Sequence, residues 1–342
     1  MRSRHLVLTL VIAAAALPVL AAGPYTKVAE IPVGGAVAFD YLNADGPGKR
    51  LYLSHGTEVV VIDTEKNTVI GKIPGLVGVH GIALAPDLGK GFITEGRNGN
   101  RVAIFDLKTL AVTSKISIAG TPEANPDAIM YEPTQKHVWA FNHSGNSVTI
   151  IDAVNGVALA TTPLSGVVEN GVADASIGKV FINIEDKNAV DVVDMKTFKL
   201  VATYPVAPAE EPTGSAMDAA AHHLFVGGGP NLVMMDTRTG KVLASAKICD
   251  GTDATFYDAA TKTAYVSCSD GHITAVAVNG DTLKVAETIT TTPRARTMAL
   301  DALTHKIYVA GATYLPVDPK TPTARPQAAP DSFRVLVFAP GK

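Results

Sequence analysis

Histidines, carboxylates and arginines recur near the ends of short apolar segments of this 342-residue chain. Histidine and carboxylate side chains are ordinary ligands of divalent metal ions and can act as general acids or bases. Arginines suit carboxylate or phosphate groups. No His-x-His or His-x-x-x-His spacing occurs, so any site for a divalent metal would be assembled from distant segments. The candidate ligand-binding residues are His55, His80, Glu95, Arg97, Asp127, His143, Glu169, Glu185, Glu211, Asp253, Arg294 and Arg296.

The sequence lacks the common catalytic motifs. Gly-x-Ser-x-Gly, His-Glu-x-x-His, a phosphate loop, a dinucleotide fingerprint and Cys-x-x-Cys-His are all missing, so no catalytic residue and no cofactor is assigned. Cys249 and Cys268 are the only cysteines. We expect both on the same face of the predicted fold. The sequence is compatible with a disulfide between them and with two free thiols.

The elements that must position these residues form a repeat. Short strands end in an aspartate followed by a polar turn, and these aspartates lie 42 to 46 residues apart: Asp63, Asp106, Asp152, Asp194 and Asp236. A second series of strands, rich in β-branched and aromatic residues, has seven members. Four short strands in each such unit predict an all-β fold, a seven-bladed β-propeller of four-stranded antiparallel blades.

The ends of the repeat predict how the ring closes. The last blade lacks its outer strand, and the segment 26–34 matches the outer strand of blade one. The N-terminal strand therefore completes blade seven, and deletion of residues 23–34 is expected to destabilise the whole ring. A Pro-rich insertion, 315–330, interrupts blade seven.

The segment 59–74, Val-Val-Val-Ile-Asp-Thr-Glu-Lys-Asn-Thr-Val-Ile-Gly-Lys-Ile-Pro, resembles the YVTN-type β-propeller repeat, and Tyr308-Val309-Ala310-Gly311 stands where the eponymous tetrapeptide would be. The resemblance covers essentially the whole chain after residue 22, and the whole looks like a YncE-like periplasmic protein. It implies a seven-bladed propeller and a binding or surface-associated role.

Repetition separates structural from singular residues. The recurring aspartates are interpreted as turn-closing residues, and His222, His223 and His305 as solvated residues of the bottom loops. The loops around the opposite end of the channel, the top face, differ between blades and therefore carry the candidate ligand-binding residues. We expect a polarised funnel: an arginine fork with His55 and His80 on one side, and an acidic wall including Glu169, Glu185 and Glu211 on the other.

The first 22 residues have a basic start, a short apolar run and small residues at the end, which predicts a secretory signal peptide cut after Ala21 or Ala22. Residues 23–342 then form one domain that is periplasmic or secreted, with no further membrane span and a monomeric state. Losing Arg2 and Arg4 leaves 27 basic against 32 acidic residues, a net charge of −5. This balance argues against nucleic acid as a partner.

These observations favour a module that binds a small molecule or a protein at its top face and has no chemistry of its own. One alternative is a metal-assisted hydrolase, lactonase or lyase in which His80, Glu169 and Glu211 carry the chemistry. Another is a propeller subunit of a periplasmic redox complex whose cofactor lies elsewhere.

Overall fold

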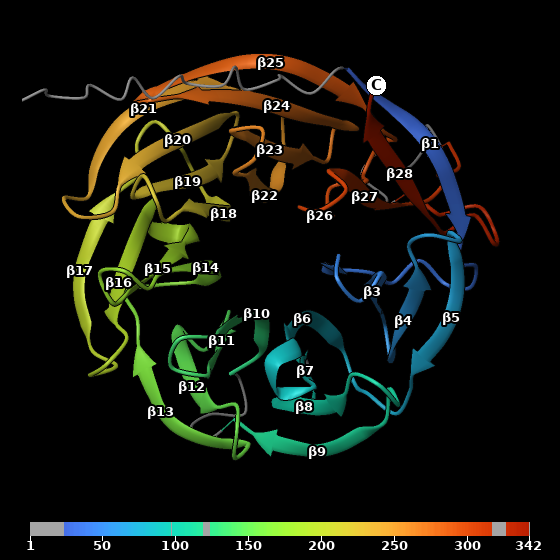
Figure 1. Cartoon of the computed structure of the whole chain (residues 1–342), viewed down its shortest axis with the longest axis horizontal. Helices are drawn as coiled ribbons and strands as arrows, with labels where there is room; N and C mark the ends of the chain where they lie inside the picture. Colours follow the sequence, from blue (N-terminus) through green and yellow to red (C-terminus); the bar gives the residue numbers. More distant parts are fainter. Residues whose placement is uncertain (1–23, 97, 119–123, 317–325, 342) are drawn as a thin grey trace, which may run out of the picture.

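The computed structural model describes residues 24–96, 98–118, 124–316 and 326–341. Its strands form seven four-stranded antiparallel sheets arranged in a ring (Figure 1). This arrangement confirms the seven-bladed β-propeller predicted from the repeats. The predicted signal peptide, residues 1–22, lies outside the described residues. No helix within the described ranges is long and apolar enough to cross a membrane.

Each blade contributes one strand to each of four concentric layers. The innermost strands are β2 (Leu42–Asp45), β6 (Val79–Ala85), β10 (Pro126–Glu132), β14 (Val168–Asp174), β18 (Pro212–Asp218), β22 (Thr252–Asp258) and β26 (Met298–Asp301). The second strands are β3 (Arg50–His55), β7 (Lys90–Glu95), β11 (His137–Asn142), β15 (Lys179–Ile184), β19 (His223–Gly228), β23 (Thr263–Cys268) and β27 (Lys306–Gly311).

The two outer layers follow the same order around the ring. The third strands are β4 (Glu58–Asp63), β8 (Arg101–Asp106), β12 (Ser147–Asp152), β16 (Ala189–Asp194), β20 (Asn231–Asp236), β24 (His272–Asn279) and β28 (Arg334–Pro340). The outer strands are β5 (Thr68–Ile73), β9 (Val112–Ser117), β13 (Val157–Pro163), β17 (Leu200–Pro205), β21 (Lys241–Lys247), β25 (Thr282–Thr290) and β1 (Tyr25–Pro32). Two 3₁₀ turns, η1 (Pro86–Leu88) and η2 (Glu185–Lys187), lie in connections.

The core lies between the blades. Strands of the second and third layers are buried along almost their whole length, whereas outer strands such as β5 are largely exposed. Apolar side chains on the two faces of each blade meet those of its neighbours; for example, Tyr52 of blade one lies 5.8 Å from Phe105 of blade two between ring centroids. Because both faces of the inner strands are covered, the sequence needs long runs of β-branched and aromatic residues with few charges.

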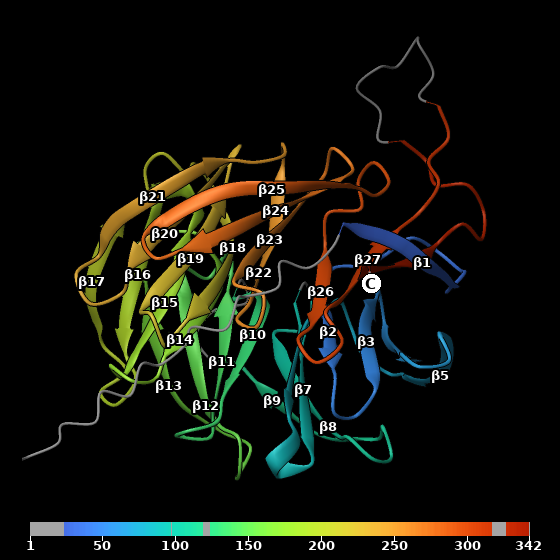
Figure 2. The same ribbon diagram turned by 45° about the horizontal axis from the view of Figure 1, so that its top comes forward.

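The N-terminal strand closes the ring as predicted. β1 pairs antiparallel with β28, from Tyr25 opposite Pro340 to Pro32 opposite Arg334, and becomes the outer strand of blade seven (Figure 1). In the tilted view of Figure 2, β1 lies at the outer edge of blade seven. The hydroxyl of Tyr25 donates to the carbonyl of His305 at 2.8 Å and lies 3.1 Å from that of Tyr265, which ties the strand to blades six and seven.

The recurring aspartates close turns, as the repeat analysis predicts. Each accepts hydrogen bonds from the backbone N–H groups two and three residues later; for Asp63 the donors are Glu65 at 2.9 Å and Lys66 at 2.8 Å. The same pair of bonds occurs at Asp106, Asp152, Asp194 and Asp236. These carboxylates are therefore occupied by local turn geometry.

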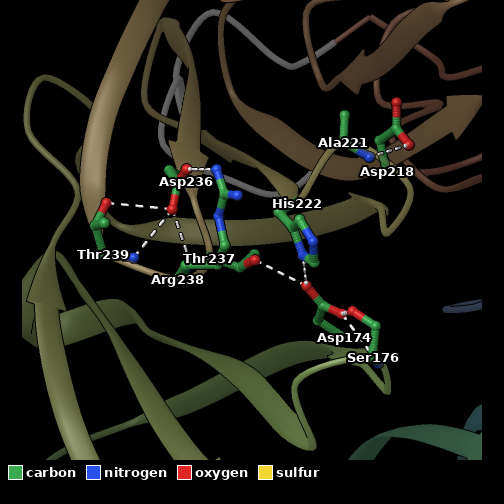
Figure 3. A network of polar contacts seen from close by, with 9 residues as sticks. All are labelled: Asp174, Ser176, Asp218, Ala221, His222, Asp236, Thr237, Arg238 and Thr239. Carbon is green, nitrogen blue, oxygen red and sulfur yellow. Dashed lines mark hydrogen bonds and ion pairs between the residues drawn. The ribbon is translucent and has the colours of Figure 1, made fainter.

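The bottom histidines are not merely solvated loop residues, contrary to the sequence-based expectation. His222 Nδ1 lies 2.9 Å from Asp174 Oδ2 of the preceding blade, and the Thr237 hydroxyl donates to the same oxygen at 2.8 Å (Figure 3). His305 Nδ1 lies 2.6 Å from Asp258 Oδ2, again across a blade boundary. The bonds from Ser176, His222 and Thr237 outweigh burial and lower the pKa of Asp174. These contacts join neighbouring blades below the core.

Candidate functional site

A bulge at the start of the innermost strand shapes the top face in blades two to six. In blade two, Val79 pairs with Glu95 and Ile82 with Ile93, so three steps along β6 match two along β7. The same shift occurs at the start of β10, β14, β18 and β22. An extra residue at such a bulge redirects a side chain out of the regular pleat, here at the end of the strand nearest the channel mouth.

The register identifies one equivalent residue per blade, two positions before the first regular pair of the innermost strand. We call this set the mouth ring. It consists of Asp40, His80, Asp127, Glu169, Thr213, Asp253 and Arg296. Four of the seven are carboxylates and one is an arginine, so the ring is acidic at neutral pH.

Side chains of the second strands fix the backbone of the mouth ring. The Thr94 hydroxyl and the Asn183 amide donate to the backbone carbonyls of Asp127 and Thr213, at 2.5 and 2.9 Å. The Ser267 hydroxyl donates likewise to the carbonyl of Arg296. Each donor holds the ring residue of the next blade, so the ring is positioned by inter-blade contacts rather than by free loops.

His80 lies between two carboxylates. Its Nδ1 is 2.5 Å from Asp40 Oδ2 and 3.3 Å from Asp127 Oδ1. Burial, followed by the nearby Asp40 and Glu169 carboxylates, raises the pKa of Asp127 to about 7 even though His80 opposes the shift. The carboxylates on this side of the ring therefore carry more negative charge than His80 neutralises.

Asp253 and Arg296 occupy the mouth ring in blades six and seven. Arg296 Nη1 lies 3.7 Å from Asp253 Oδ1, and the arginine side chain remains 56% exposed. Burial raises the pKa of Asp253 to about 7; Arg296 counteracts this, and Asp40 and Glu169 add to it. The single arginine of the ring thus compensates its neighbour only in part.

Tyr41 extends across the channel below the mouth ring. It follows Asp40 in blade one but packs against the apolar cluster of blades three and four. It lines both a small cavity of about 50 Å³ beside Glu169 and Asp253 and a larger channel of about 590 Å³ that continues toward the bottom face. Burial, followed by the charges of four mouth-ring carboxylates, raises the pKa of Tyr41 well above its ordinary value. Tyr41 therefore separates the acidic mouth from the lower channel.

A second group of ligand-type side chains sits beside Glu169. His143, in the β11–β12 connection, places Nε2 3.1 Å from Glu169 Oε1 and 3.9 Å from Glu185 Oε2. The bond to Glu169 raises the pKa of His143, and burial followed by the neighbouring Glu169 raises that of Glu185. Ligand atoms of these three residues lie within 4.8 Å of one another, and the same is true of Asp40, His80 and Asp127. Either group has the donor set of a divalent metal site.

Several predicted site residues make structural contacts instead. Glu95 is buried and accepts from Lys115 of the outer strand β9 at 2.9 Å, so it serves its own blade. His55 stacks on Phe333 at 5.2 Å between ring centroids, which joins blades one and seven. Glu211 lies two residues before the mouth-ring position of its blade, which is occupied by Thr213. Arg97 lies outside the described residues.

The structure separates the two arginines of the predicted fork, whereas Glu169 and Glu211 of the predicted acidic wall both lie close enough to Glu185 to raise its pKa. Arg296 faces Asp253, whereas the exposed Arg294 lies over the Tyr314 ring at 5.3 Å, so no contact among the described residues joins the two arginines into a fork. The two histidines at the mouth, His80 and His143, are also each paired with a carboxylate. The described parts of the predicted insertion, 315–316 and 326–330, project away from blade seven (Figure 2). Tyr314, just before the insertion, is bridged to Ala328 within it.

Sequence reasoning missed Tyr41 and Thr213, and it placed Asp40 only near the site. The sequence does not show the register between the first two strands of each blade. In every blade, the fourth residue of the second strand pairs with a residue of the innermost strand, and the mouth-ring residue lies two positions before that partner. The sequence left the state of the two cysteines undecided. In the structure they form a disulfide between the end of β23 and the connection into β22, with Cα atoms 5.8 Å apart.

Comparison with known proteins supports the fold. A chain in the crystal structure of a mitotic checkpoint complex superimposes with a TM-score of 0.76 at 12% sequence identity, and the alignment covers 100% of each chain. At this identity the likeness concerns the fold alone. No model of a known protein family matches the chain, and no curated protein matches it.

Proposed function

We propose that this protein is a binding module whose mouth ring takes a positively charged ligand, either a small molecule or a group on a protein. The observation that carries the proposal is the surplus of carboxylates at one position of the ring. Asp40, Asp127, Glu169 and Asp253 converge on the channel mouth from four blades, against one arginine. Two of them have a pKa near 7 because burial and like charges penalise ionisation. A bound cation would relieve that penalty.

The proposal includes export. The signal-like sequence of residues 1–22 and the disulfide both suit an oxidising compartment, and we assign the protein to the periplasm or the exterior of the cell. Membership of the YVTN-type, YncE-like family is part of the same proposal and rests on the repeat sequence. The structural neighbour comes from a protein complex, which suits the view that the ring can present a surface to a protein partner.

Calorimetric titration of chelator-treated protein with amines and with anions tests the sign of the ligand charge. The amines would be 1,4-diaminobutane and spermidine, and the anions citrate and phosphate. We expect the amines to bind, with affinity reduced at least about 10-fold in Asp253→Asn, because a lost bond to a charged group costs roughly 1.5 kcal/mol or more. Asp281→Asn, on a side chain that is 70% exposed, is the matched control and should bind normally. Binding of anions that depends on Arg296 would overturn the proposal.

A metal-assisted hydrolase or lyase is the second candidate. The observation that favours it is the placement of His80 and His143 between carboxylates at the same mouth. Such groups can position a metal ion and move protons during hydrolysis. Hydrolysis of a panel of lactones and aryl esters, with and without added divalent metal, separates this candidate from a module that only binds.

A further inference from the structure

The mouth contains a smaller group of side chains that fits a metal ion better than an organic cation. His143, Glu169 and Glu185 come from blades three and four and surround one point at the rim of the ring. We propose that these three residues bind a divalent transition-metal ion such as Zn²⁺, an inference that rests on the cation-binding mouth proposed above and names the class of cation.

The distances in this group suit one ion. Donor atoms held at about 2.1 Å from a metal lie about 3 Å apart at right angles and about 4.2 Å apart on opposite sides. His143 Nε2 lies 3.1 Å from Glu169 Oε1 and 3.9 Å from Glu185 Oε2, within that range. An ion therefore needs only small side-chain adjustments to be bound by all three residues.

The choice of ligands indicates the class of metal. One imidazole with two carboxylates suits zinc, manganese, cobalt or iron, whereas calcium and magnesium prefer oxygen ligands alone. Three protein ligands leave coordination positions open. The small cavity of about 50 Å³, which Glu169 also lines, has room for a few water molecules on that side.

The other histidine group fits less well. His80 Nδ1 is only 2.5 Å from Asp40 Oδ2, closer than two ligands of one ion can approach. Both histidines bond to a carboxylate without a metal, so the two groups differ in spacing: the 3.1 Å between His143 Nε2 and Glu169 Oε1 is wide enough for two ligands of one ion. The structure thus ranks two groups that have the same residue types.

The backbone around the proposed ligands is well anchored. The N–H of His143 donates to the carbonyl of Asn125 at 3.1 Å, and the N–H of Glu185 donates to the carbonyl of Val167 at 2.9 Å. Asp186, next in the chain, accepts from the N–H of Val167 at 2.8 Å. The N–H of Val168, next to Glu169, donates to the carbonyl of His143 at 3.3 Å. The bonds at Val167 and Val168 thus link both connections to the strand that carries Glu169, so the three ligands are held near one another before any ion arrives.

The test uses the full chain after chelator treatment and dialysis. Zn²⁺ is titrated calorimetrically, and Co²⁺ serves as a spectroscopic probe because its visible absorption reports nitrogen and oxygen ligands. We expect one ion per chain, an affinity at least about 10-fold lower in His143→Gln and in Glu185→Gln, and loss of the Co²⁺ bands in both. His272→Gln is the matched control, since His272 also lies 3.2 Å from a carboxylate but on blade six away from the mouth ring.

The outcomes separate this inference from the proposed function. Binding of Zn²⁺ that survives His143→Gln but is lost in His80→Gln overturns the assignment of ligands. If Zn²⁺ does not bind while amines still do, the proposed metal site is wrong and the proposed binding of organic cations at the mouth stands. Failure of both Zn²⁺ and amines overturns both. Circular dichroism of each variant checks that the ring remains folded, so a loss of binding cannot be confused with unfolding.

Discussion

Replacing Asp253 by asparagine should stabilise the folded protein at alkaline pH. The pKa of this carboxyl is about 7 in the folded chain against an ordinary value of 3.8, because it is buried beside other acids. In the unfolded chain the group ionises freely above pH 4, so the folded state holds a proton that the unfolded state has released. Stability therefore falls as the pH rises from 4 to 7, and asparagine, which cannot ionise, removes that fall.

The size of the effect follows from the same two values. One pKa unit corresponds to about 1.4 kcal/mol, so ionising Asp253 in the folded state costs up to about 4 kcal/mol at pH 8. At pH 4 the cost drops below about 1 kcal/mol, because the group is then protonated when folded and only half ionised when unfolded. For a chain of this length 4 kcal/mol would raise the melting temperature by roughly 6 °C.

Urea denaturation of chelator-treated protein at pH 8 and at pH 4 measures the effect. Asp253→Asn should raise the free energy of unfolding at pH 8 by several times its effect at pH 4, whereas the exposed control Asp281→Asn should show little change at pH 8. An increase of equal size at both pH values, or none at pH 8, would refute the argument that burial and like charges oppose ionisation at the mouth. Such a result would also weaken the case for a cationic ligand.

Three further predictions concern the scaffold. Deletion of Tyr25–Pro32 removes the partner of β28 and should lower the melting temperature by more than 10 °C in a calorimetric scan, whereas an unchanged value would show that the ring needs no closing strand. Thr237→Val removes one donor to the buried Asp174 and should cost about 1 to 2 kcal/mol in urea denaturation; serine at the same position should restore most of it. Replacing both Cys249 and Cys268 by serine should cost about 3 kcal/mol of unfolding free energy while amine binding stays unchanged, and a loss of binding instead would place the disulfide in the site.

The propeller could be predicted because its determinants are local. Each blade repeats an apolar alternation followed by tight turns, and five of the seven also repeat the turn aspartate at the end of the third strand. Each of these signals lies within about 45 residues. Ring closure was also predictable, since β1 resembles β5 and fills the place that the last repeat lacks. Asp63 and its equivalents were assigned to turns for the same reason: one carboxylate and two N–H groups lie within four residues of each other.

The mouth could be predicted only as a region. Assigning Glu211 rather than Thr213 to blade five missed by two residues, because the bulge before each regular pair shifts the register and is invisible in the apolar pattern. Charge pairing failed for another reason. Whether Arg296 meets Asp253 or Arg294 depends on how neighbouring blades pack, and that geometry arises from contacts between residues of different repeats. The contact between His222 and Asp174 at the bottom face could not be predicted for the same reason, because it joins two different blades.

Ring closure makes the order of the blades along the chain arbitrary for the folded molecule. The N–H of Gly341 donates to the carbonyl of Pro24 at 3.0 Å, so the two ends of the described chain meet within blade seven. A circularly permuted gene that joins these ends with a short Gly-Ser linker and opens the chain at the exposed turn around Asn155 should give the same ring. Its folding kinetics should differ, however. In the native order the β1–β28 pairing spans almost the whole chain and has the highest loop-closure entropy, whereas the permuted order makes that pairing local.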